Sequence, residues 1–128
     1  MSIPEADAAY LSARGIPYQV VTEPGTTSIV FPGWRLPAGF DPQSSDLLVR
    51  LQAGYPDVPP DMWWFDPAVR LADGRAIPNA DVREAHIGRT WQRRSRHLQP
   101  SQWRVGSDGL ESYLALIRRE LDRTAGLL

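Results

Sequence analysis

Gly54-Tyr55-Pro56-Asp57-Val58-Pro59-Pro60 is the stretch on which the interpretation of the whole chain depends. Its three prolines fix the backbone φ angle, and they exclude both a helix and a central strand. We expect a rigid turn in which Pro56, Pro59 and Pro60 have a structural role, because prolines reduce the entropy of the unfolded chain. Tyr55 is expected to be mostly buried, with its hydroxyl hydrogen-bonded to the backbone.

Four segments around this turn have the composition of β-strands. Residues 18–23 are rich in β-branched residues, and residues 27–31 alternate and end at a Pro-Gly pair. Residues 46–51 follow a loop rich in Gly, Pro and Ser, and the aromatic residues 62–65 come directly after the turn. Neighbouring residues of a strand point to opposite faces, so one of the two adjacent tryptophans can be exposed. The spacing and the turn residues predict a four-stranded antiparallel meander.

A helix is predicted near each end of the chain. Ser2 and Glu5 have the spacing of a capping box, and Gly15 is a suitable terminator. The residues of this helix expected to face inward are Ala6, Ala9, Tyr10 and Ala13. Asp108 and Glu111 have the same capping-box spacing before the last helix. Its apolar residues recur at helical spacing, at Leu110, Tyr113, Leu114, Ile117 and Leu121.

Residues 70–102 show weak periodicity and many turn-forming residues, so they are predicted to be mostly irregular, with room for a short hairpin or a helical turn within them. A loop of this length inside a compact domain usually has a function. The order of helix, meander, long irregular loop and helix predicts a single α+β domain over residues 1–128.

The composition excludes several classes of protein and site. The chain has 128 residues and no cysteine, which excludes disulfides, zinc sites built on thiolates and every thiol nucleophile. Its two histidines, His86 and His97, are too few to predict a metal site, and no cofactor is expected. The net charge of −1 argues against a general nucleic-acid binder. No apolar run approaches the roughly 20 residues that cross a bilayer, so we expect a cytoplasmic protein.

The order of the predicted elements and three motifs resemble the ubiquitin-conjugating enzymes. Residues 55–60 are similar to the tyrosine-proline turn and paired prolines of that superfamily, and Phe65-Asp66-Pro67 is similar to its phenylalanine-x-proline. Trp103 is similar to the tryptophan that ends the active-site loop ahead of the next helix. The resemblance covers nearly the whole chain and implies a UBC-like fold.

The resemblance is closer to one bacterial branch of the superfamily, and it lies in residues 36–40, 54–56, 95–97 and 103–110. That branch lacks the usual cysteine and tends to be encoded beside an activating enzyme, a ubiquitin-like protein and a JAB-type metalloprotease. The resemblance implies a protein that binds a ubiquitin-like protein, its activating enzyme, or both. Without cysteine it cannot carry a thioester, and the superfamily's histidine-proline-asparagine motif is absent after Phe65. We therefore expect a non-catalytic relative.

Ser95 and His97 are the candidates for an enzymatic alternative. The superfamily's cysteine lies a fixed step before the tryptophan, and counting eight residues back from Trp103 reaches Ser95. A serine hydroxyl activated by a histidine base could hold a ubiquitin-like C-terminus as an oxyester. Residues two apart do not face each other on a strand or a helix, so only a turn would join these two side chains. The acids considered for orienting His97 are Asp66, Asp73 and Asp81.

Residues 85–107 are rich in arginine and contain no acid. One interpretation is a docking patch for an acidic partner. Its candidate residues are Arg89, Arg93, Arg94, Arg96 and Trp91. A solvated charged face is the simplest alternative. A site for single-stranded nucleic acid is a third, because Trp91 and Trp103 interleave with the arginines.

Overall fold

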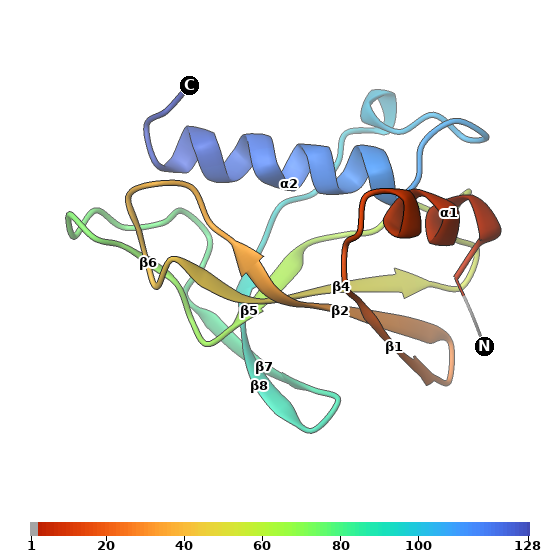
Figure 1. Cartoon of the computed structure of the whole chain (residues 1–128), viewed down its shortest axis with the longest axis horizontal. Helices are drawn as coiled ribbons and strands as arrows, with labels where there is room; N and C mark the ends of the chain where they lie inside the picture. The colour runs from red at the N-terminus through yellow and green to blue at the C-terminus, as the bar shows by residue number, and fades with distance from the viewer. Residues whose placement is uncertain (1–2) are drawn as a thin grey trace.

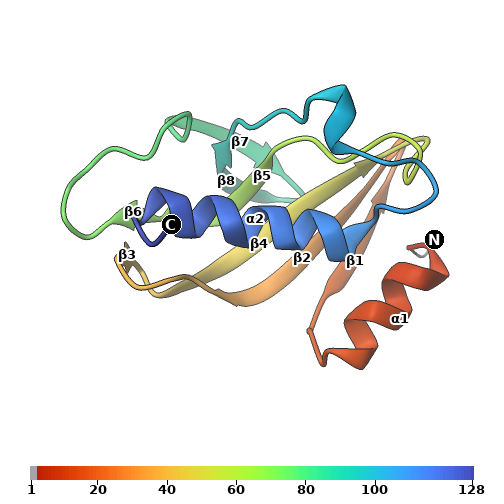
Figure 2. The ribbon, with the colours of Figure 1, turned by 90° about the horizontal axis from the view of Figure 1, so that it is seen from above.

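The computed structural model describes residues 3–128, so Ser2 and its predicted capping box lie outside the described residues. An antiparallel sheet of six strands, in the order β1-β2-β4-β5-β8-β7, is covered on one face by α2 (Figures 1 and 2). The helices are α1 (Glu5–Ala13), η1 (Pro100–Gln102) and α2 (Leu110–Thr124). The strands are β1 (Gln19–Glu23), β2 (Thr26–Arg35), β3 (Phe40–Asp41), β4 (Ser44–Gln52), β5 (Trp63–Asp66), β6 (Arg70–Leu71), β7 (Val82–His86) and β8 (Arg89–Arg94). The predicted α+β class and the four-stranded meander, β1-β2-β4-β5, are confirmed.

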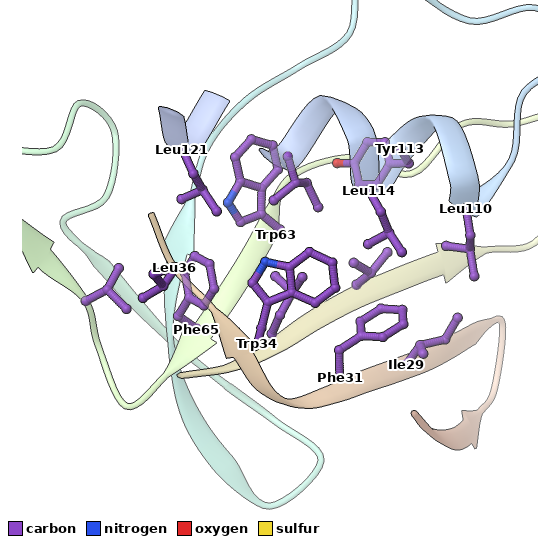
Figure 3. Close-up of a cluster of buried hydrophobic side chains, with 14 of the residues drawn as sticks. Ile29, Phe31, Trp34, Leu36, Trp63, Phe65, Leu110, Tyr113, Leu114 and Leu121 are labelled. Atoms are coloured by element: carbon purple, nitrogen blue, oxygen red, sulfur yellow. The ribbon is translucent and has the colours of Figure 1, made fainter. Parts of the chain in front are cut away.

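Strand β2 is longer than predicted. The pattern predicted an end at Pro32-Gly33, but the strand continues to Arg35 through a shift in register between Phe31 and Trp34. Gly33 has a φ of +62°, and its N–H donates to Asp46 Oδ1 at 2.9 Å. This irregularity lets β2 continue past Pro32 and places Trp34 beneath α2 (Figure 3).

Residues 70–102 contain a short hairpin and a helical turn, the two elements for which the prediction of a mostly irregular segment left room. Strand β7 pairs with β8, and β8 pairs with β5, which extends the meander by two strands. The two-residue connection Ile87-Gly88 has positive φ angles of 47° and 78°. Such turns are usually signalled by Asn-Gly or Asp-Gly. Because the first position of this turn is an isoleucine, the turn could not be recognised from the sequence.

The last helix packs on the sheet through its predicted stripe. Leu110, Tyr113, Leu114 and Ile117 are each at most 1% exposed, and Leu121 is buried beside them. They cover residues that alternate along the strands, including Phe31, Leu47, Val49, Trp63 and Phe65 (Figure 3). The Tyr113 hydroxyl donates to the Met62 carbonyl at 2.7 Å and so anchors α2 to the start of β5. The predicted packing face of this helix is confirmed.

The opposite face of the sheet, which we call the outer face, has a small core of its own. It consists of Val30, Leu48, Trp64 and Trp91, all buried. Trp63 and Trp64 point to opposite faces as predicted, but neither is exposed, since the hairpin β7–β8 supplies Trp91 to cover the outer face.

Helix α1 uses a different face from the predicted one. Three of the alanines expected to face inward, Ala6, Ala9 and Ala13, are exposed. Asp7 and Leu11 are buried instead, and Leu11 is fully so. An alanine side chain offers little apolar area, so the leucine decides the rotation of the helix. That rotation points the Asp7 carboxylate at the start of α2.

Asp7 joins three separate parts of the chain. Its Oδ1 accepts the N–H of Leu110 at 3.0 Å, and its Oδ2 accepts the hydroxyl of Tyr55 at 2.7 Å. The predicted Asp108–Glu111 capping box is therefore wrong. The N-cap is Gly109, and Asp108 accepts the N–H of Arg104 instead. The first turn of α2 is capped from α1, across more than a hundred residues of sequence.

The 54–60 turn is held from two sides. The Trp103 indole N–H donates to the Pro56 carbonyl at 2.8 Å, and its ring lies 6.4 Å from that of Tyr55. Tyr55 is half-buried, and its hydroxyl bonds a carboxylate where a backbone acceptor was predicted. Burial and the bond to Asp7 raise the pKa of Tyr55 above its usual range. The turn fixes α1 and α2 relative to the sheet.

Candidate functional site

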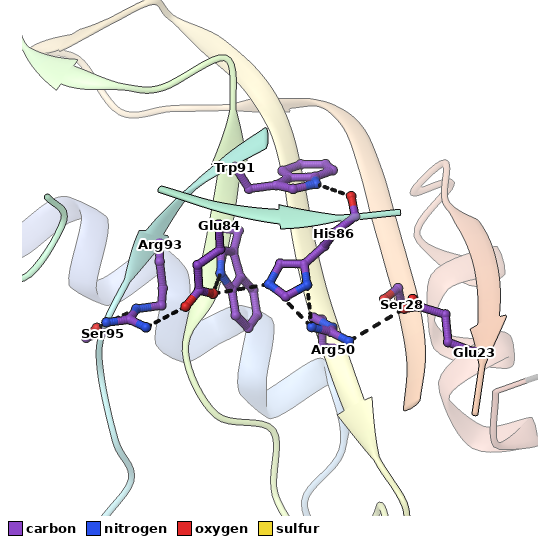
Figure 4. Close-up of polar contacts among 9 residues, drawn as sticks. Glu23, Ser28, Arg50, Glu84, His86, Trp91, Arg93 and Ser95 are labelled. Atoms are coloured by element: carbon purple, nitrogen blue, oxygen red, sulfur yellow. Dashed lines mark hydrogen bonds and ion pairs between the residues drawn. The ribbon is translucent and has the colours of Figure 1, made fainter. Parts of the chain in front are cut away.

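Ser95 lies directly after β8, where the chain leaves the sheet. Its backbone N–H donates to the carbonyl of Asn79 at 2.9 Å. Its hydroxyl oxygen accepts a hydrogen bond from Arg93 Nε at 3.0 Å (Figure 4). Among residues 3–128 no base is hydrogen-bonded to this hydroxyl, so the described part of the chain offers no group that would take its proton.

His97 is not joined to Ser95. Its Nδ1 lies 2.7 Å from Asp61 Oδ1, in an exposed pair just before β5. Two of the acids considered for orienting His97 bond arginines instead, Asp66 with Arg89 and Asp73 with Arg75. The orienting acid is Asp61, which lies 36 residues away and was not considered in the sequence analysis. The structure brings together a histidine and a carboxylate, but not the serine.

A chain of polar contacts crosses the outer face beside Ser95 (Figure 4). Arg93 donates to Glu84 Oε2 at 2.6 Å, and the Trp64 indole donates to Oε1 at 2.9 Å. His86 lies between Glu84 and Arg50, at 3.1 Å and 2.5 Å. Because the arginine can only donate, Nδ1 of His86 accepts and its Nε2–H points to Glu84. The hydroxyl of Ser95 is thus the end of a structural network.

Three of the four arginines predicted as a docking patch, Arg89, Arg93 and Arg96, are paired with acids within the protein. Arg89 binds the carboxylates of Asp46 and Asp66, each at 2.9 Å, and lies over the Trp91 ring at 4.3 Å. Arg96 lies 3.4 Å from Glu120 of α2. The acids missing from residues 85–107 therefore come from other elements. Paired arginines offer little to a phosphate backbone, which weakens the nucleic-acid alternative.

Arg94 is the least neutralised of this group. It forms no ion pair within residues 3–128, and its NH1 donates to the Ser95 carbonyl at 3.1 Å. Burial lowers the pKa of its guanidinium. Its charge lies 5.9 Å from the Trp63 ring centroid, on the α2 side of the sheet. This position is half-buried, so Arg94 does not form an open patch with Arg93, which points to the outer face.

Trp91 requires a correction. It was predicted as a partner-binding residue, but it is 0% exposed and belongs to the outer-face core. Its indole N–H donates to the His86 carbonyl at 3.0 Å, which closes the β7–β8 hairpin. Along β8, the alternation of a strand places Trp91 on the same face as Trp64. It therefore packs the hairpin onto the sheet.

Asn79 was missed by the sequence analysis. Ile77-Pro78-Asn79 retains the last two residues of the histidine-proline-asparagine motif that was reported absent. Asn79 adopts a φ of 56°, a conformation that asparagine tolerates better than most residues. Its carbonyl holds the backbone of Ser95. The Pro-Asn pair was the available signal, and the isoleucine in place of histidine obscured it.

Over the part of the chain that the structure describes, no group of three or more His, Cys, Asp or Glu side chains could hold a metal ion. No helix among these residues is long and apolar enough to cross a membrane.

Replacing Glu84 with glutamine is expected to flatten the acid side of the stability profile. Burial alone would raise the pKa of Glu84, but hydrogen bonds from Trp64, His86 and Arg93 and the charge of Arg93 outweigh burial and lower it. In the unfolded chain a glutamate has a pKa of about 4.3, so it binds its proton more readily than Glu84 does in the folded protein. The contribution of Glu84 to the stability of the fold is present above the pKa of the unfolded chain. It is lost as the pH falls through the lower pKa of the folded state.

The check is the melting temperature between about pH 7 and pH 3. Over the acid part of this range, the melting temperature of the wild type should fall further than that of Glu84→Gln. Glu111→Gln, at an exposed position of α2 without an ion pair among the described residues, is the control and should follow the wild type. Parallel curves for all three proteins would contradict the assignment.

Residues 3–124 match a family model described as Prokaryotic E2 family E. No curated protein and no solved structure gave a match.

Proposed function

Since the chain belongs to prokaryotic E2 family E, we propose that it is a non-catalytic E2-like protein of a bacterial conjugation pathway. It binds a ubiquitin-like protein, its activating enzyme, or both, and presents one to the other. The chain has no cysteine and so cannot carry a thioester. The observation that carries the proposal is the state of Ser95. Its hydroxyl oxygen accepts a hydrogen bond from Arg93, and no base in the described part of the chain is hydrogen-bonded to it.

The geometry around Ser95 opposes activation in a second way. Arg93 is held by Glu84, and Glu84 is held in turn by Trp64, so the guanidinium cannot leave Ser95 without disturbing these partly buried contacts. His97 would have to leave Asp61 to reach the hydroxyl. A general base has to lie within hydrogen-bond reach of the proton that it removes. The network therefore supports a structural role for Ser95.

The Ser95→Ala variant tests this proposal. The protein is incubated with the activating enzyme, ATP and the ubiquitin-like protein, and the products are separated on a non-reducing gel. We expect no covalent adduct with the wild type, and we expect conjugation by the reconstituted pathway to be unchanged by Ser95→Ala. Binding of either partner to the wild type, measured by calorimetry, is the positive part of the test. A wild type that binds neither protein would contradict the proposal.

The second candidate is a conjugating enzyme that forms an oxyester at Ser95. The observation in its favour is the His97–Asp61 pair, because a carboxylate that orients a histidine is a common part of a serine nucleophile site. In that case the gel shows an adduct that resists thiol reductant and breaks in mild base. Ser95→Ala would abolish the adduct, and His97→Ala would slow its formation by about 10²–10⁴-fold. An adduct of this kind would replace the first proposal.

A further inference from the structure

Two exposed arginines outside the predicted patch have no acidic partner within residues 3–128. Arg35 ends β2, and Arg118 lies on the third turn of α2. Both line the same two adjoining depressions, with volumes of about 240 and 250 Å³. We call this surface the arginine groove, and it is bordered by Ile16, Pro17, Trp34, Arg35, Pro37 and Arg118. We propose that the arginine groove docks an acidic, partly apolar segment of a protein partner.

The charge of Arg118 is held in place before any partner arrives. Its guanidinium carbon lies 4.6 Å from the centroid of the Trp34 ring. Trp34 is 7% exposed and packs edge-to-face on Phe31, so the ring is a fixed support. A guanidinium stacked on an aromatic face loses less freedom when it binds a carboxylate than a free side chain does. Arg118 is therefore prepared to bind an anion, in contrast to the paired arginines of β8.

The floor of the first depression is apolar. It is formed by Ile16, Pro17, Phe31 and Pro32, next to the bulge at Gly33 that lets β2 continue to Arg35. Pro17 is exposed and Ile16 is half-buried, so an apolar side chain of a partner would bury surface there. Asp122 borders only the second depression. The acidic residues of the partner segment are accordingly expected over the first, beside Arg35 and Arg118.

A protein segment suits this groove better than a nucleic acid. Two arginines neutralise too few phosphates to hold a backbone at physiological salt, and the floor offers a proline and an isoleucine where stacking would need an exposed aromatic face. A protein segment with carboxylates between apolar residues matches the positive charge of the walls and the apolar surface of the floor. The inference rests on the proposed function only in taking the partner to be a component of the same pathway.

The experiment has two parts, so that this inference and the proposed function can fail separately. In the first, a fluorescein-labelled peptide of alternating glutamate and leucine is titrated with the wild type and with the double variant Arg35→Glu, Arg118→Glu. The matched control is Arg83→Glu, Arg104→Glu, which changes the net charge equally at two exposed positions outside the groove. The double variant is expected to weaken binding by at least about tenfold, and the control much less.

In the second part the same three proteins are titrated with the activating enzyme and the ubiquitin-like protein. We expect one of the two to bind the wild type and the control alike and to lose at least about tenfold in affinity for the groove variant. Circular dichroism shows whether the variants are folded. Arg118→Lys keeps the charge but loses the planar stacking on Trp34, so its affinity should lie between those of the wild type and the groove variant.

Several results would overturn the inference. The first is equal weakening by the groove variant and the control, or peptide binding that does not depend on Arg35 and Arg118. The second is a single-stranded oligonucleotide that competes for the groove, which would assign a nucleic acid. The third is a dimeric wild type with a monomeric groove variant, which would assign a second copy of the chain. If the groove variant loses the peptide while the wild type binds neither pathway protein, only the proposed function fails.

Discussion

Replacing Asp7 with alanine is expected to lower the free energy of unfolding by about 3–5 kcal/mol. Two hydrogen bonds to the carboxylate are lost, and a bond to a charged group is worth about 1.5–3 kcal/mol. The change leaves the Tyr55 hydroxyl and the Leu110 N–H without their acceptor. It also removes one negative charge from the N-terminus of α2, where Glu111 of the first turn remains. Chemical denaturation with urea measures the loss directly.

Tyr55→Phe is the control, because it removes one of the two bonds and leaves the cap on Leu110 intact. We expect it to cost about 1.5–3 kcal/mol, and to cost little when it is added to Asp7→Ala. Gly109 gives an independent check, since a Cβ there would lie 2.8 Å from Asp7 Oδ1. Gly109→Ala should therefore displace the carboxylate and destabilise the protein. A variant Asp7→Ala as stable as the wild type would refute the role of this residue.

Trp91→Ala is expected to cost about 3–5 kcal/mol of stability, the usual range for removing a buried tryptophan. The side chain is 0% exposed, and it packs with Val30, Leu48 and Trp64. Its loss would open a cavity under the hairpin and free the His86 carbonyl. Hydrogen exchange should show β7 and β8 losing protection first, since they contribute little other apolar cover to the sheet.

A role for Trp91 at a binding surface gives the opposite result. The stability of Trp91→Ala would then equal that of the wild type, while affinity for a partner would fall. Trp91→Phe distinguishes packing from the indole hydrogen bond, because it keeps the ring and removes the donor. We expect a loss intermediate between the wild type and Trp91→Ala.

Local patterns were enough to predict much of this fold. The stripe Leu110–Leu121 has a single periodicity that only a helix satisfies. The four strands that were predicted, β1, β2, β4 and β5, lie between strong turn signals. The position of the β7–β8 hairpin was not predicted, because Ile87 adopts a positive φ that is unusual for an isoleucine. Propensity rules describe what most residues do, and they fail where the surrounding structure imposes the exception.

The candidate site was harder to predict, because its contacts join residues far apart in the chain. Ser95 and His97 are two residues apart, yet their side chains bind Arg93 and Asp61. Arg89 has no acid near it in sequence, but the sheet register brings Asp46 and Asp66 to it. Counting charges along the sequence therefore overestimated the positive surface of β8. Conversely, Arg35 and Arg118 are far apart in the sequence and come together only in the fold.

The bond between Asp7 and Leu110 also has a consequence for synthesis on the ribosome. Helix α1 emerges long before α2, and the N–H that its carboxylate binds is made about a hundred residues later. Until α2 follows, the inner face of the sheet, with Phe31, Trp63 and Phe65, has nothing to cover it. A nascent chain in this state exposes apolar surface of the kind that aggregates or recruits chaperones. Ribosomes that stall before residue 110 should therefore release chains that are degraded, while those that stall after residue 124 should release folded protein.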